Sequence, residues 1–80
     1  MTKNEIIEKL VLICKNKLNE SKNLQNSKKT EIFETILKIL SIPEFYLKQD
    51  IEVTMNILKD LEIEDGYMLE IIKVLFSENN

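Results

Sequence analysis

Residues 2–18 read TKNEIIEKLVLICKNKL, and this stretch predicts the first helix of the protein. It opens with a capping box, in which Thr2 caps the following backbone amides and Glu5, three residues later, returns a hydrogen bond. Apolar side chains then recur at the three- and four-residue steps of an α-helix, with lysines, acids and asparagines between them. We therefore expect a helix from about Lys3 to Leu18.

The next segment, residues 19–30, reads NESKNLQNSKKT and is polar throughout apart from one leucine. Asn and Ser side chains compete with backbone hydrogen bonding and favour turns, so we expect a loop here. A second helical periodicity follows, with Ser27 or Thr30 available as its cap. This helix should end at Ile42, because the residue before Pro43 is pushed out of the helical conformation.

A second capping box lies at residues 41–44, SIPE, with its proline early in the first turn, where the missing N–H costs little. Apolar residues continue from there on one helical face as far as Leu61. The pattern predicts one long third helix from about Pro43 to Leu61, and Asp50 is the point at which it would alternatively divide in two.

Residues 61–72 fit two structures. Apolar and polar residues alternate on both sides of Asp65-Gly66, which is typical of a β-hairpin. The apolar residues after Gly66 also fit helical spacing, and Gly66 would then be the glycine that ends the third helix. We expect a fourth helix from about Tyr67 to Phe76, with the hairpin as the alternative.

These elements predict one domain over residues 1–80, an all-α, small four-helix bundle-like fold, or three helices plus a C-terminal β-hairpin. At this size a core buries only about 60–65% of the surface of the unfolded chain. The first helix is apolar almost all round between Leu10 and Cys14, so it should bury more than one side. A homodimer or a partner's groove would provide the second contact.

The composition removes several kinds of functional site. The 80 residues include no His, no Arg, one Cys and one Gly. His is the usual general base near neutral pH and the commonest metal ligand, and Arg is the side chain that reads phosphate and guanine in a bidentate manner. One cysteine without histidine cannot form a zinc site, and one glycine cannot form a phosphate-binding loop. We therefore expect no enzyme, no cofactor and no metal.

Cys14 and the acidic string DLEIEDG at residues 60–66 carry the remaining candidate chemistry. Cys14 lies in the apolar stripe of the first helix without a histidine to activate it, so we expect a buried small hydrophobe. The acidic string fails the spacing of a calcium loop at its sixth and twelfth positions and predicts a solvated turn. A lone cysteine, no signal-peptide pattern and no apolar run near the roughly 20 residues of a membrane span favour the cytoplasm.

The net charge of −3 is distributed unevenly between the two halves of the chain. Residues 1–40 contain 8 Lys and 5 acids, a net of +3, whereas residues 41–80 contain 3 Lys and 9 acids, a net of −6. The lysine-rich region 15–29 could contact phosphates, but without arginine it would read few bases. An acidic surface in the second half would suit a basic protein partner and would mainly set on-rate and specificity.

We therefore expect a non-enzymatic protein-binding module, acting as a regulator, inhibitor, immunity protein or assembly subunit. Its partner is another protein, including a second copy of itself, and no membrane is involved. Nucleic acid is the less favoured partner, and a small nucleic-acid-associated factor using region 15–29 is the alternative function. A tyrosine, for its apolar ring with a polar tip, and five acids are the expected partner-binding residues: Tyr46, Glu52, Asp60, Glu62, Glu64 and Asp65.

Overall fold

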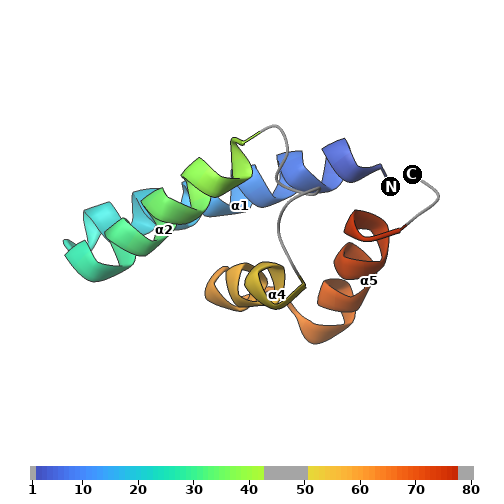
Figure 1. Ribbon diagram of the computed structural model, residues 1–80. Coiled ribbons are helices and arrows are strands. Elements are labelled where there is room, and N and C mark those ends of the chain that lie inside the picture. Colours follow the sequence, from blue (N-terminus) through green and yellow to red (C-terminus); the bar gives the residue numbers. More distant parts are fainter. Residues whose placement is uncertain (1, 43–50, 78–80) are drawn as a thin grey trace.

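The computed structural model describes residues 2–42 and 51–77, and within them the chain is all-α (Figure 1). These residues form four helices: α1 (Lys3–Asn23), α2 (Ser27–Leu40), α4 (Ile51–Asp60) and α5 (Asp65–Leu75). The small helical, bundle-like fold expected from the sequence is confirmed. The hairpin alternative at residues 61–72 is wrong, because α5 occupies most of that segment.

Helix α1 begins as predicted but runs five residues further. The Thr2 hydroxyl accepts the Glu5 amide at 3.1 Å, and the Glu5 carboxylate accepts the Thr2 amide at 3.4 Å, which completes the capping box. The expected end at Leu18 is wrong because Ser21 does not form a loop. Its side chain is buried and its hydroxyl donates to the Leu18 carbonyl at 2.8 Å, so the helix continues to Asn23.

The loop predicted over residues 19–30 is reduced to three residues by a tight helix ending. Gln25 takes the left-handed backbone conformation, with φ 56°. The Asn26 amide then donates to the Ser21 carbonyl at 2.9 Å, and the Gln25 amide donates to the Lys22 carbonyl at 3.1 Å. This pair of bonds is the Schellman motif, which usually places glycine where Gln25 stands.

Asn26 caps α2, so the expected caps Ser27 and Thr30 lie inside the helix instead. The Asn26 side-chain oxygen accepts the Lys29 amide at 3.1 Å. The Thr30 hydroxyl is left to face α1, where it lies 3.0 Å from the Ser21 hydroxyl. Helix α2 ends at Leu40, two residues before the expected end.

The third predicted helix is described only in its second half. Residues 43–50 lie outside the described residues, and with them Pro43 and Glu44 of the predicted capping box at 41–44 and the division point at Asp50. Helix α4 covers Ile51–Asp60 and ends one residue before the predicted Leu61.

The turn from α4 to α5 is made at Glu62, whereas the sequence predicted an ending at Gly66. Glu62 has φ 60°, and the Ile63 amide donates to the Leu58 carbonyl at 3.0 Å in a second Schellman ending. The prediction that Gly66 ends this helix is wrong, because α4 ends at Asp60 and the turn with positive φ follows at Glu62. Gly66 lies instead in the first turn of α5, which begins two residues earlier than expected.

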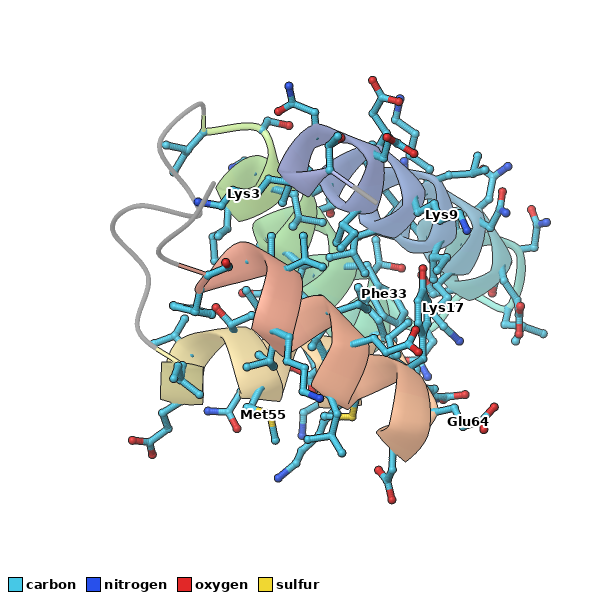
Figure 2. All side chains as sticks on the ribbon, turned by 90° about the vertical axis from the view of Figure 1, so that its right-hand side faces the viewer. Lys3, Lys9, Lys17, Phe33, Met55 and Glu64 are labelled. Carbon is cyan, nitrogen blue, oxygen red and sulfur yellow. The ribbon has the colours of Figure 1, made fainter. Side chains whose placement is uncertain are left out.

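Two antiparallel pairs build the core. Helices α1 and α2 form a helical hairpin, and α4 and α5 lie together on one side of it (Figures 1 and 2). Phe33 points from α2 into the space between the two pairs, and Lys9 of α1 lies 5.9 Å from the ring centre of Tyr67 on α5. The core side chains come from all four helices and the α4–α5 turn: Ile6, Leu10, Cys14, Phe33, Ile36, Leu40, Ile57, Leu58, Leu61, Met68, Ile71 and Leu75.

The backbone conformations at Gly66 and Gln25 predict that moving glycine out of the helix and into the turn would stabilise the protein. Gly66→Ala should raise the free energy of unfolding by about 0.5–1 kcal/mol, since Ala favours a helix and the added Cβ would meet no atom within 4 Å. Gln25→Gly should also stabilise by about 0.5–1 kcal/mol, because glycine adopts positive φ without a Cβ clash. Urea unfolding measures both. Gln25→Ala is the control, and an equal gain for it would contradict the backbone explanation.

Thr54 on α4 provides a second stability prediction. Its side chain is 1% exposed, and among the described residues its hydroxyl oxygen has no hydrogen-bond partner. A buried, unsatisfied hydroxyl costs about 1–3 kcal/mol, so Thr54→Val, which keeps the shape, should stabilise the protein by about 1 kcal/mol. Thermal unfolding would then show a melting temperature about 4–8 °C higher. A lower melting temperature would mean that the Thr54 hydroxyl has a partner in solution, such as a water molecule.

Candidate functional site

An open groove of about 510 Å³ runs between α2 and α4. Five aliphatic side chains form most of its floor: Ile32, Ile36, Ile39, Val53 and Ile57. Ile36 and Ile57 belong to the buried core, whereas Ile32 and Val53 are each 37% exposed. On each helix these residues follow three- and four-residue steps, so they share one face. The groove is therefore a part of the apolar interior that opens to solvent.

The groove forms because its two walls, α2 and α4, pack mainly against other helices and not against each other. Helix α2 packs along α1, and α4 packs on α5, which in turn contacts α1. The two walls consequently make few direct contacts with each other. Among residues 2–42 and 51–77, the space that a direct α2–α4 packing would fill stays open.

The N-terminal end of α2 and the C-terminal end of α4 lie at the same end of this groove. Lys29 and Phe33 of α2 share a second, small pocket of about 90 Å³ with Glu62, which directly follows α4. Glu62 is also tied to α1, because its carboxylate lies 3.4 Å from the Lys17 ammonium group. The two walls therefore run in roughly opposite chain directions.

This arrangement gives the groove one charged end and one apolar end. Lys28 and Glu31 line it from the first turns of α2, and Asp60 lines it from the last residue of α4. At the opposite end the described lining residues are Ile39 and Val53. Two carboxylates and one ammonium group thus face the same end of an apolar channel.

The six residues predicted to bind a partner are not gathered into one surface: Tyr46, Glu52, Asp60, Glu62, Glu64 and Asp65. Tyr46 lies outside the described residues. Glu52 and Asp60 are exposed at opposite ends of α4, about 12 Å apart along its axis. Of the five acids, Asp60 lines the groove and the other four do not.

Three of these acids surround the turn between α4 and α5. Glu62 pairs with Lys17, but its side chain is 72% exposed, so the pair adds little to stability. Glu64 is the residue before α5 and makes no side-chain cap. Asp65 in the first turn interacts favourably with the helix dipole. The predicted acidic, solvated turn is thus present, but it lies beyond the end of the groove.

The floor of the groove was not predicted from the sequence. The stripe containing Ile32, Ile36 and Ile39 was visible as one face of the second helix, and its width was the available signal. Helix α2 carries a buried row, with Phe33 and Leu40, and a neighbouring row with Ile32 and Ile39. A stripe wider than one neighbouring helix can cover indicates a second contact.

The apolar excess of α1 is largely used within the chain. Val11 and Ile13 pack against the core from partly buried positions, and α1 contacts both α2 and α5. The expectation that this helix buries more than one side is confirmed. Leu12 remains 60% exposed, and a single exposed leucine is normal on a protein surface. A homodimer through α1 stays a prediction.

The lysines of region 15–29 lie on different surfaces. Lys17 pairs with Glu62, Lys28 lines the groove between α2 and α4, and Lys29 lines the small pocket. Lys15 and Lys22 are exposed, two turns apart on α1. Nucleic-acid binding by this region stays a prediction.

Cys14 is a core residue, as predicted. Its side chain is fully buried and its thiol donates to the Phe33 carbonyl at 3.2 Å. Desolvation by burial raises the pKa of the thiol above its ordinary value of 9.0, so the nucleophilic thiolate is disfavoured.

Residues 2–42 and 51–77 contain no group of three or more His, Cys, Asp or Glu side chains placed to hold a metal ion. Over the same ranges no helix combines the length and the apolarity that crossing a membrane requires. Comparison of the chain with protein-family models, with curated proteins and with solved structures gives no match.

Proposed function

We propose that the protein is a non-enzymatic protein-binding module that receives apolar side chains of its partner in the groove between α2 and α4. The observation that carries the proposal is the floor of this groove, where Ile32 and Val53 extend the core to the surface. An apolar strip with a polar rim is the usual anatomy of a protein interaction site.

The dimensions of the groove suit an α-helix as the bound element. Its α2 wall runs from Lys28 to Ile39, eleven residue steps or about 16 Å. Three turns of a partner helix cover that length and present apolar anchors at steps of three, four and seven residues. Binding in this mode requires that the partner helix match the groove in shape and bury apolar side chains in it. It requires no chemical step.

The module would act by holding or covering a segment of its partner. That action suits the roles of regulator, inhibitor, immunity protein and assembly subunit. We place it in the cytoplasm, where the reducing environment keeps a lone thiol such as Cys14 free. A second copy of the chain is one occupant that the experiments below can identify.

Charged substitutions on the floor of the groove test the proposal. Ile32→Lys and Val53→Lys should each weaken partner binding at least about tenfold, because an ammonium group would be desolvated in the contact. Both side chains are already partly exposed, so the circular dichroism spectrum should not change. Leu69→Lys is the matched control, since Leu69 is 63% exposed on α5 and does not line the groove.

The measurement has two steps. A host protein captured by affinity purification is identified by mass spectrometry, purified, and titrated with the wild type and the three variants by calorimetry. Equal affinities for the wild type and both groove variants would contradict the proposal. A salt-dependent shift of mixed-sequence DNA, without any protein partner, would instead support the nucleic-acid alternative through region 15–29.

A further inference from the structure

We infer that the partner of the α2–α4 groove is a helix with a basic side chain in its first turn, which binds between Glu31 and Asp60. This inference rests on the proposed function and adds the chemistry and the direction of the partner. Its basis is the uneven distribution of charge along the groove.

Glu31 and Asp60 stand on opposite walls at the same end of the groove. Glu31 lies on α2 and Asp60 closes α4, and both side chains are exposed. Within the described ranges neither carboxylate has an ion-pair partner. Lys28, one turn before Glu31, is the one cation among the described residues that line the groove, so its lining carries a net negative charge. A basic group entering between the two walls would complement it.

The apolar end of the groove fixes the direction of the bound helix. A charged side chain placed over Ile39 and Val53 would lose its hydration without gaining a partner among the described lining residues, which is costly. The basic residue must therefore lie at the Glu31–Asp60 end. The N-terminus of a helix carries the positive end of its dipole, so the first turn of the partner fits this end best.

The same distribution of charge argues against a second copy as the occupant. In a two-fold dimer through the groove, the charged end of one copy meets either the charged end or the apolar end of the other. The first arrangement brings four carboxylates against two ammonium groups, and the second buries charges against Ile39 and Val53. Both are unfavourable, so a separate partner with a basic first turn is the better match.

Two synthetic peptides test this inference. Each has 14 residues, one stripe of leucines at helical spacing and the same lactam staple, which makes both helical. They differ at one position of the first turn beside the stripe, which is Lys in one peptide and Glu in the other. The Lys peptide should bind the wild-type protein about tenfold more tightly in fluorescence anisotropy.

A charge swap on the protein should reverse this preference. The double variant Glu31→Lys/Asp60→Lys should bind the Glu peptide more tightly than the Lys peptide. The matched control Glu34→Lys/Glu64→Lys makes the same change in net charge at exposed positions outside the groove, and it should keep the preference of the wild type. Methyl NMR should place the contact on Ile32, Val53 and Ile57 and leave Leu69 unshifted.

Four results would overturn the inference: equal affinity of the wild type for the two peptides, no binding of either peptide, a preference that the swap leaves unchanged, or methyl shifts outside the groove. Sedimentation that shows a dimer dissociated by Ile32→Lys would overturn it as well, because the occupant would then be a second copy. The proposed function is judged separately. It stands if Ile32→Lys and Val53→Lys still weaken the binding of the captured host protein.

Discussion

Burial of α1 between α2 and α5 is the interaction on which the rest of the structure depends. Helix α2 packs along α1, and α5 packs on α1 and brings α4 with it. The two outer helices, α2 and α4, are thus placed by their contacts with other helices and not by contact with each other. The groove is a consequence of this arrangement. Because α2 packs on α1 and α4 packs on α5, the two walls can remain apart while the core beneath them stays packed.

The faces of the helices could be predicted from sequence, whereas several of their ends could not. Periodicity is a local property, so the stripe from Ile6 to Cys14 and the capping box at Thr2 identified α1 correctly. The ends depend on single residues in uncommon conformations. Gln25 and Glu62 take the left-handed conformation that usually indicates glycine, and the one glycine, Gly66, lies inside a helix. Nothing in the residue types at these positions indicates that choice.

The candidate site was predictable only in fragments. Asp60 was expected to bind a partner because of its charge, and Ile32 was visible as part of an apolar stripe, but their proximity depends on how α4 is placed against α2. That placement is set by contacts far apart in the chain, through α5 and α1. The acids of the α4–α5 turn are adjacent in sequence, which made them conspicuous, yet they lie outside the groove. Non-local packing therefore determines which charged side chains line the groove.

The composition of the groove bears on how selective it can be. Its apolar floor consists of isoleucine and valine, whose β-branched side chains have few accessible rotamers. A floor of this kind loses little side-chain entropy on binding and adapts poorly to a different shape, unlike the flexible methionine-rich surfaces of promiscuous proteins. Shape along the floor and charge at one end then act on different properties of the complex. In the proposed complex, the floor would select the spacing of the partner's apolar anchors, and the Glu31–Asp60 end would select the direction in which the partner lies.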